Sequence, residues 1–209
     1  MKEIYNKYIN NKLKYEKYQI IGIICLTIAF SGFFGWVYEF IFYYFNGGMK
    51  EFYMQGGNYL PWINIYAYGA ILIMFFSHKF KKKPILVFLI SLLSTGLLEF
   101  LSGYVLFKFF GLRFWDYNVE IWNFGNIGGY ICFRSVTFFA ISGMFLMYVI
   151  VPFFSYLSFK MKKKSFLIIS ITLCALVLID EIYNLVIVKL FNLPGATKFY
   201  RSLGFDYVK

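Results

Sequence analysis

The chain has 209 residues, of which 60% are hydrophobic and 24% are aromatic, and its formal net charge at pH 7 is +11. This composition excludes an ordinary soluble protein, because soluble domains are only about half apolar. The apolar runs also leave no room for a separate soluble domain. We therefore expect a single helical membrane domain.

Five apolar runs follow one another along the chain. A transmembrane helix needs about 20 residues to cross about 30 Å of hydrocarbon. The runs cover residues 19–44, 61–77, 84–107, 130–156 and 166–188, and the second run is the shortest. We predict an all-α polytopic bundle of about five transmembrane helices. In this prediction residues 1–18 form a basic cytoplasmic segment, residues 19–188 form the membrane domain, and residues 189–209 form an outer tail.

The positive charge is concentrated in three segments that would all lie on one side of the membrane. Their cations are Lys2, Lys7, Lys12, Lys14, Lys17, Lys79, Lys81, Lys82, Lys83, Lys160, Lys162, Lys163 and Lys164. Less Glu3 and Glu16, they account for the whole net charge. This positive-inside pattern places the N-terminus in the cytoplasm and, after five spans, the C-terminus outside. It predicts a multi-pass protein of the cell membrane that contacts the lipid bilayer and its anionic headgroups, and it argues against nucleic-acid binding.

Four acidic residues interrupt the apolar runs, each in the part of its run that faces outward in this topology. They are Glu39, Glu99, Asp180 and Glu181, and Arg134 lies at a similar depth. An ionised group near the centre of a membrane helix costs about 2.5–3.5 kcal/mol or more, so such groups generally line a cavity or a pathway. The positions therefore indicate a polar site that opens away from the cytoplasm.

Small and hydroxyl residues share a helix face with three of these carboxylates. The three faces are Ser31, Gly35 and Glu39; Ser91, Thr95, Glu99 and Ser102; and Ser170, Cys174, Glu181 and Asn184. Small residues let membrane helices approach closely, so each face should meet a neighbouring helix. Asp180 points about 100° away from Glu181, so only one of the pair is expected to face the centre. We predict an outward-opening cavity lined by Glu39, Glu99, Arg134, Asp180, Glu181 and Asn184.

The motifs of several enzyme classes are absent from the sequence. The only histidine, His78, lies beside the cytoplasmic lysines, which excludes a His-based triad in the outer cavity and an H-E-x-x-H zinc site. The sequence has no P-loop motif, and its three cysteines lack C-x-x-C spacing. We therefore assign no catalytic residue, no metal ligand and no cofactor.

Three functions remain compatible with the carboxylates. The favoured one is a transport or ligand-binding cavity for a small cationic or lipid-like ligand. The second is an enzyme that acts on lipids or lipid-linked precursors at the outer leaflet, with Glu39 or Glu99 as acid or base. The third is a non-catalytic membrane scaffold, in which contacts between Arg134 and the carboxylates fix the packing of the helices.

The outer segments carry the most specific motifs. The first, residues 46–60, contains the glycine pairs Gly47-Gly48 and Gly56-Gly57, which permit turns. The second, residues 108–129, contains Trp115-Asp116-Tyr117 and is either a loop or a re-entrant segment. Within it, Asp116 is placed to cap a helix or to pair with Arg113, and Gly125 with Gly129 forms a G-x-x-x-G step suited to close helix packing.

The order of these motifs resembles that of the putative ABC-transporter type IV family (CmpB-like), small multi-pass membrane proteins in which WDY precedes N-x-x-G-x-I-C. The matching positions are Trp115, Asp116, Tyr117, Asn126, Gly129, Ile131 and Cys132, with Leu60-Pro61, Tyr66, Gly69-Ala70 and Glu99. Asn64, Ala67 and Asn118 depart from the family pattern. The resemblance implies a permease-like role. We predict a permease-like or substrate-binding membrane component that uses a separate nucleotide-binding ATPase subunit, with the WDY segment as a lid over the cavity.

Overall fold

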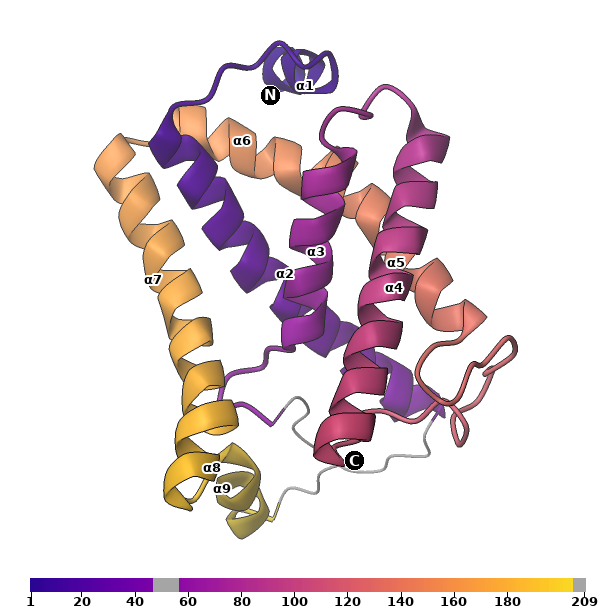
Figure 1. The fold of residues 1–209 in the computed structure, drawn as a ribbon. Coiled ribbons are helices and arrows are strands. Elements are labelled where there is room, and N and C mark those ends of the chain that lie inside the picture. The colour runs from indigo at the N-terminus through magenta and orange to yellow at the C-terminus, as the bar shows by residue number, and fades with distance from the viewer. Residues whose placement is uncertain (47–56, 205–209) are drawn as a thin grey trace. The chain divides into compact units, whose positions relative to one another are not determined.

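The computed structural model describes residues 1–46 and 57–204 (Figure 1). Over these residues the secondary structure is helical, with one isolated β-bridge between Ile127 and Ile131 and no strand, which confirms the all-α prediction. The elements are α1 (Lys2–Ile9), α2 (Lys17–Asn46), α3 (Asn64–Ser77), α4 (Pro84–Phe110), α5 (Phe133–Phe145), η1 (Leu146–Ile150), α6 (Val151–Lys160), α7 (Lys163–Ile182), η2 (Tyr183–Ile187), α8 (Val188–Phe191) and α9 (Ala196–Ser202). The glycines predicted to form turns at 47, 48 and 56 lie outside the described residues.

Four continuous helices among the described residues are long and apolar enough to cross a membrane. They are Lys17–Phe45, Pro84–Phe110, Phe133–Lys160 and Lys163–Phe191. The second predicted span corresponds to α3, which has only 14 residues. At 1.5 Å per residue α3 is about 21 Å long, less than the thickness of the hydrocarbon core. The count of five spans and the outer position of the C-terminus therefore remain predictions.

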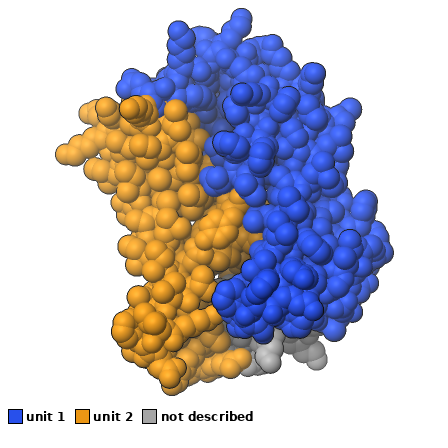
Figure 2. All heavy atoms as spheres, in the orientation of Figure 1, with its two compact units in different colours: residues 1–16, 69–160, 209 blue, residues 17–68, 161–208 orange. Residues whose placement is uncertain are grey.

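The chain forms two compact units (Figure 2). Among the described residues, unit 1 comprises residues 1–16 and 69–160, and unit 2 comprises residues 17–46, 57–68 and 161–204. Helix α3 contributes its first five residues to unit 2 and the others to unit 1. These units are defined by contacts and not by position in the membrane. The predicted division into a basic segment, a membrane domain and an outer tail therefore stays a prediction.

Helix α4 packs against α5 in unit 1 through the face of small residues predicted from the sequence. Ser91, Thr95 and Glu99 of this face are buried, and so is Gly96, which the prediction did not include. A Cβ atom on Gly96 would lie 3.1 Å from the Val136 side chain, and one on Gly143 would overlap the Ser91 hydroxyl group. The absence of side chains at these two glycines therefore sets the close approach of the two helices.

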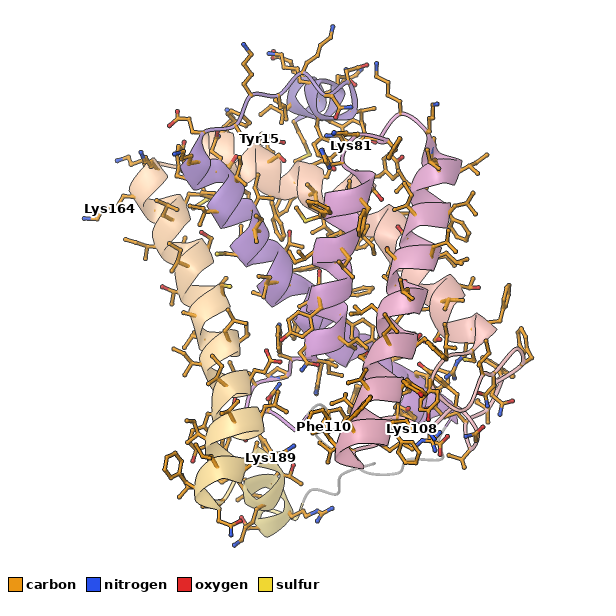
Figure 3. The ribbon with its side chains drawn as sticks, viewed as in Figure 1. Tyr15, Lys81, Lys108, Phe110, Lys164 and Lys189 are labelled. Carbon is orange, nitrogen blue, oxygen red and sulfur yellow. The ribbon has the colours of Figure 1, made fainter. Side chains whose placement is uncertain are left out.

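The N-terminal segment packs against other parts of unit 1. Asn11 donates a hydrogen bond to the carbonyl oxygen of Lys79, and the Lys81 ammonium group lies 3.8 Å from the centre of the Tyr8 ring. Tyr15 is hydrogen-bonded to Ser155 of α6 at 2.8 Å. Figure 3 labels Lys81 beside α1 and Tyr15 beside α6. Two of the basic segments predicted to face the cytoplasm thus meet at one end of this unit.

Helix α2 packs against α7 in unit 2, and three glycines of α2 receive aromatic rings. A Cβ atom at Gly22 would overlap the Phe166 ring of α7. Gly32 and Gly35 in the same way receive the rings of Trp62 and Tyr66, and Trp62 is only 1% exposed. The predicted face containing Gly35 therefore accommodates the first turn of α3.

Both of the last two long helices contain a π-helical turn. Pro152 follows η1; it has no N–H group, and in a regular helix its ring would meet the carbonyl oxygen of residue 148. The wider π turn relieves this crowding. In the second helix, the Asn184 side chain of η2 donates to the main-chain oxygen of Asp180. A side chain inserted in this way disturbs the regular ladder of backbone hydrogen bonds.

Candidate functional site

Glu99 lies on the buried face of α4 and is 3% exposed. The Tyr117 hydroxyl group donates to Glu99 Oε1 over 2.5 Å, and Ser135 Oγ lies 2.8 Å from Glu99 Oε2. Tyr117 belongs to the segment between α4 and α5, residues 111–132, which we term the WDY loop. Ser135 lies in the first turn of α5. A buried carboxyl group thus connects two helices and the loop between them.

Tyr117 donates to Glu99 as a neutral phenol. Burial and the neighbouring Glu99 raise the pKa of Tyr117 well above its ordinary value. A phenol that keeps its proton remains a hydrogen-bond donor over the whole physiological pH range.

The other residues of the WDY motif fix the position of the loop. Trp115 Nε1 donates to the carbonyl oxygen of Tyr130 at 2.9 Å, and a Cβ atom on Gly103 of α4 would lie 3.0 Å from the Trp115 ring. Asp116 forms an ion pair with Arg113 at 3.0 Å, which is one of the two roles predicted for it. The Tyr117 amide donates to the carbonyl oxygen of residue 129. These contacts hold the loop at the end of α4 that carries Glu99.

Gly129 completes the loop in a backbone conformation that favours glycine. Its φ angle is +79°, and its amide donates to Asn126 Oδ1 at 2.8 Å. Asn126 in turn donates to Asn118 Oδ1. Gly125 has a φ angle of +68°, and both glycines lie in turns before α5 begins. The G-x-x-x-G interpretation was therefore wrong, because it requires both glycines on one helix face.

Arg134, predicted to lie among the membrane carboxylates, has an acidic partner in the WDY loop. Its guanidinium group pairs with Glu120 at 2.5 Å, and both side chains are mostly buried. The guanidinium group also lies 5.5 Å from the centre of the Tyr117 ring, within cation–π range. Glu120 could not be predicted as this partner, because it lies outside the apolar runs, where an acidic residue is unremarkable.

Asp180 in unit 2 anchors the segment before α3. Its two carboxylate oxygens accept the backbone amides of Tyr59 and Leu60, at 3.0 and 2.6 Å. Asn184 donates to Asp180 Oδ1 at 2.7 Å, and Asn184 Oδ1 accepts the backbone amide of Ala196 at the start of α9. Asp180 and Asn184 together connect α7, η2, α9 and residues 59–60.

Glu181 and Glu39 accept hydrogen bonds from opposite faces of the start of α3. Glu181 is 5% exposed and accepts from Asn64 at 2.7 Å and from the Tyr68 hydroxyl group at 2.8 Å. Glu39 accepts from the Tyr66 hydroxyl group at 3.0 Å. Asn64 and Tyr68 are four residues apart and share a helix face, whereas Tyr66 is rotated by about 200° from Asn64. The two glutamates therefore lie on different sides of α3.

The predicted site residues are thus divided between the units. Glu99, Arg134 and the WDY loop lie in unit 1, whereas Glu39, Asp180, Glu181 and Asn184 lie in unit 2. A single cavity lined by all of them stays a prediction. Among the described residues, no group of three or more His, Cys, Asp or Glu side chains could hold a metal ion.

A sequence model of the family described as "Putative ABC-transporter type IV" matches residues 26–185. The chain belongs to this family. The match runs from α2 to η2, and it includes the WDY loop and all the carboxylates described above. The resemblance seen in the sequence motifs is therefore confirmed. No curated protein and no solved structure matches the chain. Membership of the putative ABC-transporter type IV family and the apolar helices indicate a membrane protein of the transport type.

Proposed function

We propose that this chain is the membrane-embedded component of a transport system, permease-like or substrate-binding, and that it works with a separate nucleotide-binding ATPase. The family and the four apolar helices support the membrane and transport parts of this proposal. The 209 residues contain no P-loop motif that could bind ATP. Energy from ATP would therefore have to come from another subunit.

The hydrogen bonds of Glu99 carry this proposal. A buried carboxyl group in a membrane helix is costly, and such groups generally belong to an ion or substrate pathway. Glu99 is hydrogen-bonded to Tyr117 of the WDY motif as well as to Ser135 of α5. In this proposal the WDY loop is the lid of an outward-opening site, and a cation or proton reaches Glu99 when Tyr117 moves away.

Glu181 is the second binding group of the proposal. It is nearly as buried as Glu99, and its partners Asn64 and Tyr68 are neutral donors. No ion pair of the described residues includes either glutamate. Both carboxyl groups are therefore available to a positively charged ligand. Glu120 is not available in this way, because it already pairs with Arg134.

The first experiment is purification of the tagged chain from its native membrane in mild detergent, with mass spectrometry of the bound proteins and lipids. A nucleotide-binding ATPase in stoichiometric amount supports the proposal. A retained lipid or lipid-linked precursor without an ATPase would overturn it and favour the lipid-enzyme alternative.

The second experiment tests the two glutamates in that purified complex. ATP-driven uptake of rubidium, choline and tetraphenylphosphonium into proteoliposomes is compared between the wild type and the Glu99→Gln/Glu181→Gln double variant. Glu3→Gln is the matched control, because Glu3 is an exposed carboxylate that pairs with Lys7 on the same helix. We expect the double variant to lose at least ten-fold in uptake and the control to lose nothing. Equal uptake in all three proteins would contradict a role for these carboxylates.

A further inference from the structure

Ser135 lies between two groups that normally accept hydrogen bonds. Its hydroxyl oxygen is 2.8 Å from Glu99 Oε2 and 2.9 Å from the carbonyl oxygen of Cys132. It also accepts the backbone amide of Cys132 at 3.3 Å. A serine hydroxyl group has one hydrogen to donate and two lone pairs that accept. It can donate its hydrogen fully to either Cys132 or Glu99, but not to both.

All of these contacts are satisfied at once if the hydrogen between Glu99 and Ser135 belongs to Glu99. We propose that Glu99 carries a proton on Oε2 and donates it to Ser135, so that the ligand of this site is a proton. Ser135 then donates its own hydrogen to the carbonyl oxygen of Cys132. Tyr117 donates to the other carboxyl oxygen, Oε1. The three hydroxyl groups, on Tyr117, Glu99 and Ser135, thus donate in one direction along a chain that ends at the backbone.

The charges around Glu99 agree with a neutral acid. Among the described residues, the charged groups that face it are Arg134 of α5 and Glu120 of the WDY loop, and these two pair with each other at 2.5 Å. With that pair neutral, an ionised Glu99 would leave one uncompensated charge in a buried site. A proton on Glu99 removes this charge without any further counter-ion.

The surroundings of Asp180 show the opposite pattern. In the part of the chain that the structure describes, its hydrogen-bond partners are all donors, namely the amides of Tyr59 and Leu60 and the side chain of Asn184. This arrangement suits a carboxylate without a proton. The two partners of Glu181 are likewise able to donate. Glu99 differs from both, because its neighbour Ser135 also lies within hydrogen-bond distance of a second acceptor, the carbonyl oxygen of Cys132.

This inference rests on the proposed function, and it narrows the ligand at Glu99 from a cation or a proton to a proton. Tyr117 and Ser135 are then positioning residues, because they hold the acid and its hydrogen in place. Their contribution can be measured through the acid group itself, without knowledge of what the protein transports.

Infrared spectroscopy of the full chain in nanodiscs of phosphatidylethanolamine and phosphatidylglycerol tests the proton directly. The carbonyl stretch of a carboxylic acid is separate from the bands of a carboxylate, and it shifts when deuterium replaces the acidic hydrogen. We expect an acid band at pH 7 that is missing in Glu99→Gln and retained in Glu181→Gln and Asp180→Asn. We also expect Ser135→Ala, which removes the acceptor of the proton, to move this band to higher frequency, and Ser135→Thr to restore it.

Two outcomes would overturn the inference. One is a wild-type spectrum at pH 7 without an acid band that depends on Glu99, which would mean that Ser135 shares its hydrogen between both acceptors. The other is an acid band that Ser135→Ala leaves unchanged; this variant keeps Glu99 and so covers the case in which Glu99→Gln does not fold. If the acid band belongs to Glu99 but no ATPase co-purifies, the proton site stands and the proposed transport role fails.

Discussion

Gly129 allows a quantitative test of how the WDY loop is built. In Gly129→Ala the new side chain must tolerate a φ angle of +79°, which costs an L residue about 1 kcal/mol. Its Cβ atom would also overlap the Arg113 guanidinium group and lie 2.5 Å from both Asp116 Oδ1 and Asn118 Nδ2. Loss of the partly exposed ion pair between Arg113 and Asp116 costs about 0.5 kcal/mol. Loss of the hydrogen bond between Asn118 and Asp116 costs about 1 kcal/mol.

Gly111→Ala is the matched control for this variant. Gly111 has a φ angle of +65°, but nothing lies within 4 Å of the position of its Cβ atom. Gly111→Ala should therefore lower the free energy of unfolding only by the backbone contribution, about 1 kcal/mol, against about 2.5 kcal/mol for Gly129→Ala. For a chain of this size, 1 kcal/mol corresponds to about 2–4 °C in Tm. Thermal unfolding in detergent micelles should show a fall of about 2–4 °C for Gly111→Ala and about 5–10 °C for Gly129→Ala. Equal falls would refute the packing of Arg113, Asp116 and Asn118 around Gly129.

Two further predictions concern other parts of the chain. Burial lowers the pKa of Lys81 from 10.5 to about 8, so between these two pH values the unfolded chain binds more protons than the folded one, and stability should rise with pH. From pH 7.5 to 10, Tm should therefore rise less steeply in Lys81→Met than in the wild type, while Lys82→Met, at an exposed position, should follow the wild type. Identical slopes in all three proteins would contradict the burial of Lys81. Thr27 of α2 is fully buried, and its hydroxyl group has no hydrogen-bond partner among the described residues. Thr27→Val removes this unsatisfied group at nearly constant volume and should raise stability by about 1 kcal/mol. Thr95→Val is the control: it removes a hydrogen bond to the carbonyl oxygen of Ser91 and should not raise stability. A lower Tm in Thr27→Val than in the wild type would show that the Thr27 hydroxyl group has a hydrogen-bond partner.

The long helices could be predicted from the sequence because hydropathy depends only on local composition. The predicted run at 84–107 corresponds to α4, Pro84–Phe110, and the run at 166–188 lies within the continuous helix Lys163–Phe191. The π turns within the last two helices were not predicted. They depend on one proline and on one asparagine side chain, and neither changes the hydropathy of its run.

The carboxylates of the candidate site could also be found from the sequence, but their partners could not. An acid in an apolar run is conspicuous by itself. The partners come from distant segments: Tyr59 and Leu60 for Asp180, Tyr117 for Glu99, and Glu120 for Arg134. From the sequence we expected Arg134 to lie among the membrane carboxylates, whereas its ion-pair partner Glu120 lies in the WDY loop. Only the three-dimensional course of the WDY loop decides this pairing.

The division into two units has a consequence for the order in which the chain can assemble during synthesis. Most of unit 1 is one continuous stretch, residues 69–160, so α4 and α5 can pair soon after they leave the ribosome. Unit 2 is discontinuous, and α2 must wait for α7, which is made only after that whole stretch. The amides of Tyr59 and Leu60 likewise have no Asp180 to bind until the last long helix is inserted. Because contacts distant in sequence form late, truncation before α7 should leave unit 1 to assemble and expose the buried face of α2 to lipids and to quality-control proteases.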